Sequence, residues 1–234
     1  MYTPPPLTPV RTLATVASVL IAAVCATNLY GTWTAWNAHS VVADYLADLP
    51  GVTDGDLYAA DDATITAVWL NVLAFVASVT VFLTWLWRAR VNSERLSSVH
   101  HRMGRGWTIG SWFCPIVNLW FPRRIVDDIW RASRPGVPAD QRQIDPLPLS
   151  PLVRAWWLVL IANYAMQYFL RLQTNSSDVT VDYFKTIAVY STISAGLMLV
   201  AGVLLIRVIR QITEWQSTPR TAVEDTTHQQ APLA

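Results

Sequence analysis

Long runs of apolar residues, separated by shorter polar connections, dominate this chain. The hydrocarbon core of a bilayer is about 30 Å thick and needs roughly 20 apolar residues in helical conformation. Four runs meet or approach this length, at about residues 12–33, 63–87, 154–171 and 184–206. The third is the shortest, and it spans if Arg154 and Arg171 extend their charged ends toward the headgroups. The pattern predicts an all-α integral membrane protein with four transmembrane helices.

Residues 107–121 form a further apolar stretch that is shorter than the spans and is interrupted by Pro115 and Asn118. Arginines flank it on both sides, which favours entry and exit at one membrane face. Non-helical backbone at membrane depth is tolerated only against protein or a water-filled cavity. We therefore expect a short re-entrant or interfacial segment on the cytoplasmic side. The alternative, a distorted fifth span, places the following arginines on the opposite side of the membrane.

A short amphipathic helix is predicted over residues 122–133, because Pro122 suits the first helical turn and apolar residues then recur at helical spacing. Opposite charges stand four residues apart in Arg123/Asp127, Arg124/Asp128 and Asp127/Arg131. Such pairs account for both aspartates without a catalytic role, at a few tenths of a kcal/mol each. We expect this helix to lie on the cytoplasmic face of the membrane.

The distribution of charge predicts the orientation. Residues 37–62 contain six aspartates and no lysine or arginine, whereas the connection between the second and third runs is rich in arginine. Basic residues concentrate in cytoplasmic loops. Both termini and the central connection are therefore predicted to be cytoplasmic, in a multi-pass protein of the plasma membrane. An uncleaved first helix is favoured over a cleaved signal because the apolar run continues past the small residues near Ala26.

Composition agrees with this class of protein. Of 234 residues, 53% are hydrophobic and only 14% are charged, against about 25% in soluble domains. The twelve tryptophans lie mostly where apolar runs begin or end, as in aromatic belts at membrane interfaces. Residues 1–11 form a Pro-rich cytoplasmic leader, 12–210 the membrane domain, and 211–234 a polar tail expected to be disordered. The net charge of +1 conceals a strong spatial separation of charge and by itself says nothing about nucleic acid. No nucleic-acid partner is expected for a membrane protein of this class.

The central sequence resembles a known family. It reads WLWRARVNSERL and then GRGWTIGSWFCPIVNLWFPRRIVDDIWRAS, and it is similar to the actinobacterial membrane proteins catalogued as domain of unknown function 4328. In that family an apolar segment of the form GWxxGxWxxPxxNLxxP precedes an IWRAS-like helix. The matching positions are Trp107, Gly110, Trp112, Pro115, Asn118, Leu119, Pro122, Ile129 and Trp130. The resemblance implies a multi-span bacterial membrane protein and implies no activity.

Candidates for chemistry are few. His100 and His101 point about 100° apart on a helix, and neither stands at a metal-binding spacing from an acidic residue, so we expect contact with headgroups or solvent. Cys25 and Cys114 form no CxxC pair. The chain contains no GxSxG or HExxH motif and no Gly-rich phosphate loop. We expect no catalytic residue, no metal and no cofactor.

The polar residues inside the apolar runs are mainly amides, namely Asn28, Asn71, Asn163 and Gln167. Hydrogen bonds between helices are one explanation for them, and a polar cavity that contains Asn118 and Asn163 is another. No charged residue lies well inside any run, which counts against a proton-coupled carrier.

Our leading hypothesis is a non-enzymatic membrane protein that acts through lipid or protein contacts at its cytoplasmic face. Tryptophans would anchor that face, at Trp107, Trp112, Trp120 and Trp130. Arginines would meet anionic headgroups or a membrane or cytoplasmic protein partner, at Arg123, Arg124, Arg131 and Arg134. The alternative is a channel or transporter for a small solute, lined by residues 107–121. A membrane-embedded enzyme is the third hypothesis, and it requires a histidine beside an acidic residue. The oligomeric state stays open.

Overall fold

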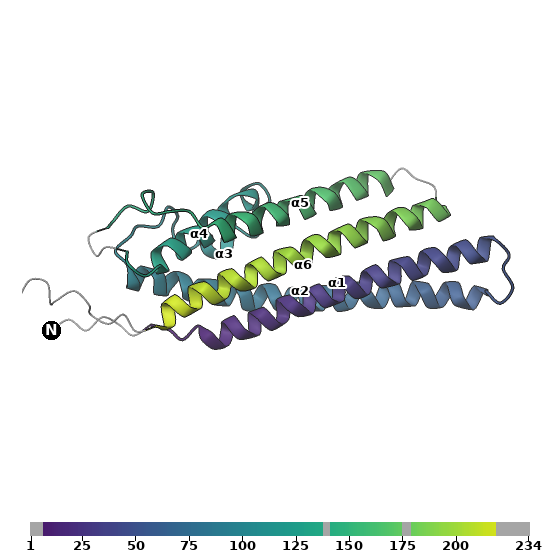
Figure 1. The fold of residues 1–234 in the computed structure, drawn as a ribbon, viewed down its shortest axis with the longest axis horizontal. Helices are drawn as coiled ribbons and strands as arrows, with labels where there is room; N and C mark the ends of the chain where they lie inside the picture. Colours follow the sequence, from purple (N-terminus) through teal and green to yellow (C-terminus); the bar gives the residue numbers. More distant parts are fainter. Residues whose placement is uncertain (1–6, 138–140, 175–178, 219–234) are drawn as a thin grey trace, which may run out of the picture.

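The computed structural model describes residues 7–137, 141–174 and 179–218. Its helices are α1 (Arg11–Leu46), α2 (Asp54–Leu96), α3 (Trp107–Gly110), the 3-10 helix η1 (Val117–Leu119), α4 (Phe121–Ser133), α5 (Pro151–Thr174) and α6 (Val181–Ser217). The described residues form no strand, and a single isolated bridge joins His100 to Gln143. Four long helices run alongside one another, and α3 and α4 gather at one end of them (Figure 1), which we call the α4 end.

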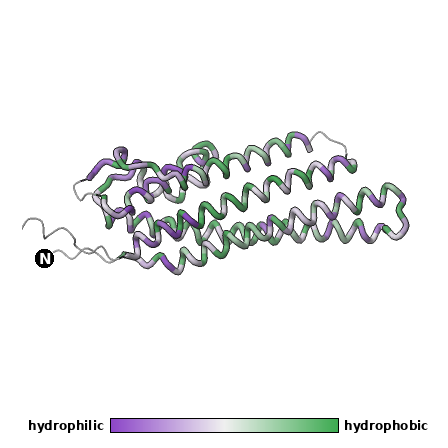
Figure 2. The backbone as a smooth tube through the Cα atoms, in the orientation of Figure 1, coloured by the Kyte–Doolittle hydropathy of each residue, from purple (hydrophilic) through white to green (hydrophobic). Residues whose placement is uncertain are grey.

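Three of the long helices, α1, α2 and α6, are long and apolar enough to cross a membrane. The prediction of an all-helical membrane protein is therefore confirmed in its coarse form. The fourth predicted span corresponds to α5, a continuous 24-residue helix that is not among these three. Figure 2 shows apolar residues along the middle of the long helices and more polar residues at the α4 end.

The helices extend beyond the apolar runs that predicted them. Helix α2 begins with a capping box, in which Thr53 and Asp56 satisfy each other's backbone donors, and it continues to Leu96. Helix α6 continues to Ser217 with Ile212 and Gln216 buried. The expected disordered tail from residue 211 is therefore wrong for 211–217, because these residues pack against the bundle. The remainder of that tail, 219–234, lies outside the described residues.

The leader also makes tertiary contacts where the structure describes it. Residues 1–6 lie outside the described part. Thr8 donates its backbone N–H to Asn92 Oδ1 at 3.0 Å, and Asn92 Nδ2 donates back to the Thr8 carbonyl at 2.8 Å. Because Asn92 is on α2, this reciprocal pair joins the chain ahead of α1 to the α4 end of the bundle.

The four long helices do not form a symmetric bundle. Helix α1 packs against α2 and α6, and α5 packs against α6 and α4. Helices α2 and α5 make no extensive direct contact. At one crossing α6 approaches α1 closely, since a Cβ on Gly202 would lie 2.7 Å from Cys25 Sγ. Small residues permit such close approach between membrane helices. The arrangement leaves the space between α2 and α5 to other elements.

Helix α4 occupies the position predicted for it, with Pro122 in its first turn. Its predicted setting on the membrane surface is wrong. Every residue from Ile125 to Ser133 is buried, and α4 contacts α2, α5 and α6. The helix is a packed part of the protein at the end of the bundle, because its charged side chains find partners inside the fold.

Candidate functional site

The charged residues of α4 form a buried ionic cluster. Asp127, Asp128 and Arg131 are each at most 3% exposed. Arg131 Nη2 lies 2.9 Å from Asp127 Oδ2, and Arg131 Nη1 donates to the Ile144 carbonyl at 3.1 Å. Asp127 Oδ1 accepts the backbone N–H of Ser150 at 2.9 Å. Burial raises the pKa of Asp127 even though these donors oppose the rise. The cluster thus joins α4 to the start of α5.

Asp128 is held by an arginine from outside the helix. The backbone N–H of Arg102 donates to Asp128 Oδ2 at 3.1 Å, and its Nε donates to Oδ1 at 2.9 Å. Arg102 Nη2 forms an ion pair with Asp128 Oδ1 and lies 3.6 Å from Asp127 Oδ2. Of the three predicted i,i+4 pairs only Asp127/Arg131 forms; Arg123 and Arg124 do not pair with the aspartates. An arginine fork that reaches both carboxylates from another segment replaces them.

A second polar network joins the end of α2 to the rest of the α4 end. Glu94 accepts from Arg90 Nε at 2.9 Å and from Arg105 Nε at 2.6 Å. Gln216 Nε2 donates to the Ala89 carbonyl at 2.9 Å and to Ser133 Oγ at 2.8 Å. Buried polar groups that are satisfied in this way specify one arrangement of α2, α4 and α6.

His101 belongs to this network, which corrects the expectation that it meets solvent or headgroups. Its Nε2 lies 3.1 Å from Ser93 Oγ. Burial, together with the charges of Arg90 and Arg102, lowers the pKa of His101 to about 3. His100 is exposed, and its ring nitrogen lies near the Arg142 carbonyl. The acidic neighbour that an enzyme would require appears at neither histidine among the described contacts. In the described part of the chain no group of three or more metal-binding side chains comes together.

In residues 107–121 the Trp112 ring faces inward, whereas the side chains of Phe113 and Ile116 face outward. Trp112 packs edge-on against Phe82 with ring centroids 5.4 Å apart, and it also contacts Trp156 and Trp157 on α5. Phe113 is 70% exposed and Ile116 is 71% exposed. The segment is secured to α5 because Trp157 Nε1 donates to the Leu119 carbonyl at 2.9 Å. It therefore fills part of the space between α2 and α5.

The other residues of the motif are likewise divided between buried and exposed positions. Trp107 and Trp120 are 42% and 40% exposed. Trp130, which we expected to anchor the face, is buried; its Nε1 donates to Gln211 Oε1 at 2.7 Å, and its ring packs on Trp215. Ile129 and Pro122 are buried, whereas Gly110, Pro115 and Leu119 are exposed. Asn118 is half-buried, and its backbone N–H donates to the Cys114 carbonyl at 2.9 Å.

The predicted arginine face is smaller than expected, because Arg131 is buried in the ionic cluster. Arg124 is exposed and Arg123 is half-exposed. The Arg134 guanidinium lies 5.9 Å from the centroid of the Trp130 ring, within range of a cation–π contact. Three of the four predicted arginines, Arg123, Arg124 and Arg134, therefore remain at the surface.

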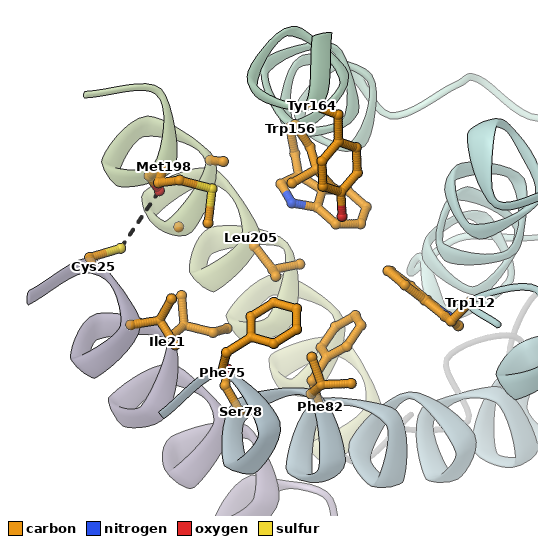
Figure 3. A pocket seen from close by; sticks show the side chains of 15 residues that line it. Ile21, Cys25, Phe75, Ser78, Phe82, Trp112, Trp156, Tyr164, Met198 and Leu205 are labelled. Carbon is orange, nitrogen blue, oxygen red and sulfur yellow. Dashed lines mark hydrogen bonds between the residues drawn. The ribbon is translucent and has the colours of Figure 1, made fainter. Parts of the chain in front are cut away.

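An apolar cavity of about 130 Å³ lies among the four long helices and Trp112. Figure 3 shows Phe75 and Phe82 of α2 facing Trp156 and Tyr164 of α5 across it. Sequence reasoning missed this cavity, since nothing in the apolar pattern indicates that α2 and α5 stay apart.

A larger groove follows the outer side of α2. It has a volume of about 670 Å³ and is lined by α2 residues and by Ile109 and Phe113 of the 107–121 segment. Phe75 and Val79 line both the groove and the apolar cavity. The two spaces are therefore neighbours across these side chains.

The predicted intramembrane amides gather away from the α4 end. Asn28, Asn71 and Gln167 line one polar cleft of about 210 Å³, together with hydroxyl groups of α1, α2 and α6. Asn71 Nδ2 donates to Thr27 Oγ1 at 2.9 Å. Ser194 Oγ accepts from Gln167 at 3.1 Å and donates to Asn163 Oδ1 at 2.7 Å.

Asn118 lines neither this cleft nor the apolar cavity. Neither of these two spaces joins Asn118 to Asn163. Asn71, Asn163 and Gln167 bond between helices, as in the simpler of the two explanations. Asn28 instead donates to the Val24 carbonyl of its own helix at 2.8 Å.

Comparison with known proteins agrees with the central motif. The family model described as "Domain of unknown function (DUF4328)" matches residues 48–214. That range contains all of α2 and α4 and every member of the ionic cluster. Comparison with the curated proteins and with the solved structures gives no match.

Proposed function

The chain belongs to the family described as domain of unknown function (DUF4328), and we propose that it acts through lipid contacts at the cytoplasmic face of the membrane. In this proposal α1, α2, α5 and α6 are four spans, and both termini are cytoplasmic. The length of α5 supports its inclusion, because 24 residues extend about 36 Å in helical conformation. The arginine-rich connection between α2 and α5 supports the orientation.

One observation carries the proposal: the outward side chains of residues 107–121 are large and apolar. Exposure of Phe113 and Ile116 to water is unfavourable by about 25 cal/mol for each Å² of apolar surface. Ile109 and Phe113 lie beside α2 residues such as Leu83, which sit on the same groove. A position within the cytoplasmic leaflet explains both facts, since lipid chains solvate such side chains without cost.

Two of the surface arginines extend this apolar surface toward the headgroups. Arg123 and Arg124 follow directly after the exposed segment, and the ion pairs of the α4 end do not use them. Each basic side chain near an anionic leaflet contributes about 1 kcal/mol. The apolar surface favours lipid over a soluble protein partner, because it is continuous with the outer face of α2.

Cysteine labelling tests the position of the segment. In a background with Cys25 and Cys114 replaced by serine, Arg105→Cys and Arg123→Cys should react with a membrane-impermeant maleimide only from the cytoplasmic side. Phe113→Cys should react only after the membrane is dissolved. Labelling of the two arginine positions from opposite sides would show a spanning segment. Free labelling of Phe113→Cys in intact membranes would show that it is not in lipid.

The headgroup contact has its own test. The double variant R123Q/R124Q should lose roughly 2 kcal/mol of binding free energy for anionic phospholipid, measured on the purified protein in nanodiscs of varied lipid charge. Lys185→Gln, at the opposite end of the bundle, is the control and should leave this binding unchanged. Equal losses in the two variants would contradict a cytoplasmic-face contact.

A second candidate function rests on the polar cleft. Amide and hydroxyl groups from all four long helices line it, and such groups suit binding of a small uncharged polar solute. If so, Asn71→Leu should lower solute flux into proteoliposomes, whereas Asn118→Leu should not. Flux equal to that of protein-free vesicles in the wild type would discard this candidate.

A further inference from the structure

We infer that the groove along α2, together with the apolar cavity behind it, holds one anionic phospholipid of the cytoplasmic leaflet. The inference rests on the proposed position of residues 107–121 in that leaflet. It adds a defined site and a defined ligand class to a general contact with lipid. The phosphate would lie at Arg88, and one acyl chain would follow the groove toward the cavity.

The charge of the groove is confined to one end. Arg88 is exposed and lines the groove beside Trp87. Its Nη1 donates to the Pro9 carbonyl at 3.3 Å, which leaves other guanidinium N–H groups for a phosphate. No carboxylate lines this groove. A guanidinium suits phosphate because it offers several N–H donors in a planar fork.

Apart from Arg88, the groove presents an apolar surface. Its two hydroxyl residues bond to their own helix, since Thr80 Oγ1 donates to the Val76 carbonyl and Thr84 Oγ1 donates to the Thr80 carbonyl, both at 2.8 Å. The other lining side chains are hydrocarbon or aromatic, including Ile109 and Phe113 on the opposite wall. Beyond Arg88, the walls therefore present a surface that suits an acyl chain.

The length of the groove fits one leaflet. Arg88 and Phe75 stand thirteen residues apart on α2, which corresponds to about 20 Å of helix. Half of the hydrocarbon core is about 15 Å. A chain that starts at a headgroup near Arg88 therefore reaches Phe75 near the middle of the bilayer.

The deep end of the groove adjoins the apolar cavity. Phe75 and Val79 line both spaces, and Phe75 is 50% exposed. On the far side Tyr164 of α5 is 47% exposed, because α2 and α5 are not packed together. Trp112 lines the cavity from the 107–121 segment (Figure 3). The end of an acyl chain can enter between the two helices without displacing a helix contact.

Native mass spectrometry of the full chain in detergent tests the site. We expect the protein to retain one phosphatidylglycerol in preference to phosphatidylcholine with the same acyl chains. Arg88→Gln should lower this retention roughly fivefold. Arg210→Gln is the matched control. Arg210 is an exposed arginine of α6, near the α4 end of the bundle, and it borders a different groove. Equal losses in the two variants, or equal retention of the two lipids, would overturn the inference.

A second pair of variants tests the path of the chain without changing charge. Val79→Trp should fill the junction of groove and cavity and reduce retention, whereas Leu73→Trp should not. Leu73 is 65% exposed on α2 and lines neither space. Unchanged retention in a folded Val79→Trp protein would overturn the path, and Arg88→Gln tests the site if that variant does not fold.

The two proposals can fail separately. If Phe113→Cys is labelled in intact membranes, the proposed lipid position fails and this site fails with it. If Phe113→Cys is protected but no phosphatidylglycerol is preferred, the position stands and only the defined site is wrong.

Discussion

Helix α4 and the segment before it are neighbours in sequence with opposite patterns of burial. In α4 the charged side chains of Asp127, Asp128 and Arg131 are hidden, each at most 3% exposed. In residues 107–120 several large apolar side chains are exposed, with Phe113 and Ile116 at least 70% exposed. A water-soluble protein shows the reverse distribution.

The side chains of the two regions require different surroundings. A buried charge requires partners, and α4 has them in Arg102, the Ile144 carbonyl and the Ser150 N–H. An exposed apolar side chain requires an apolar medium, and the neighbouring outer face of α2 indicates where that medium lies. The comparison teaches that helical amphipathicity alone did not identify which of the two regions is buried and which exposes apolar side chains.

Removal of a buried charge should have the largest effect. Arg131→Gln leaves Asp127 buried with only the more distant Arg102 opposite it, and loss of one partner of a buried pair costs about 3 to 5 kcal/mol. We expect that loss in the free energy of unfolding in detergent micelles. Arg124→Gln, on the exposed side of the same helix, should change it by less than about 0.5 kcal/mol. Similar losses of unfolding free energy in the two variants would contradict the contrast between the buried and the exposed arginine.

A charge on the outward face of the segment should have the next largest effect. Phe113→Lys should cost about 2 to 3 kcal/mol of insertion free energy if the side chain lies in lipid, seen as a lower level of folded protein in membranes. Val179→Lys is the matched control, because Val179 is 74% exposed in the connection between α5 and α6. If both variants accumulate normally, the exposed segment does not face lipid.

Acid should weaken the α4 end through His101. The pKa of His101 is about 3 in the fold and about 6.5 in an unfolded chain, so the unfolded state takes up the proton first as the pH falls. Stability is therefore lost below about pH 6.5, by about 2 kcal/mol at pH 5.

Unfolding of His101→Asn at pH 7 and pH 5 measures this contribution, since the variant should lack that part of the acid loss. The raised pKa of Asp127 acts in the opposite direction and is common to both proteins. His100→Asn should keep the full acid sensitivity. The same pH dependence in His101→Asn and the wild type would contradict the assignment.

The smallest effect separates the two tryptophans. Trp130→Phe removes a donor from Gln211, at a cost of about 1 kcal/mol. Trp120→Phe, at a position that is 40% exposed, should cost less than about 0.5 kcal/mol. Thermal unfolding of both variants measures the difference. A larger cost at Trp120 would indicate a packing role that its exposure does not suggest.

Much of the fold was predictable because the helices depend on local patterns in the sequence. Apolar runs of helical length predicted the long helices, and Pro122 with the following periodicity located α4 to within one residue. The motif also identified the residues that lie together at the α4 end. The amides Asn28, Asn71 and Gln167 were singled out by their apolar surroundings, and they do line a common cleft.

Partnerships across the chain were not predictable. Arg124 stands four residues from Asp128, yet the Asp128 carboxylate pairs with Arg102, which is 26 residues away in the sequence. No neighbour of His101 in the sequence indicates its partly buried contact with Ser93. Such pairs depend on how an irregular connection folds back, and helical spacing does not describe that path.

The sequence by itself determined that this is a helical membrane protein of one family, since the lengths of the apolar runs and the central motif are each recorded in consecutive residues. Only the tertiary structure decided that α4 is buried, that α2 and α5 stand apart, and that a groove ends at Arg88. The physical reason is that burial and cavities depend on which helix surfaces pack together. These contacts are between residues far apart in the chain, so no local sequence pattern indicates them.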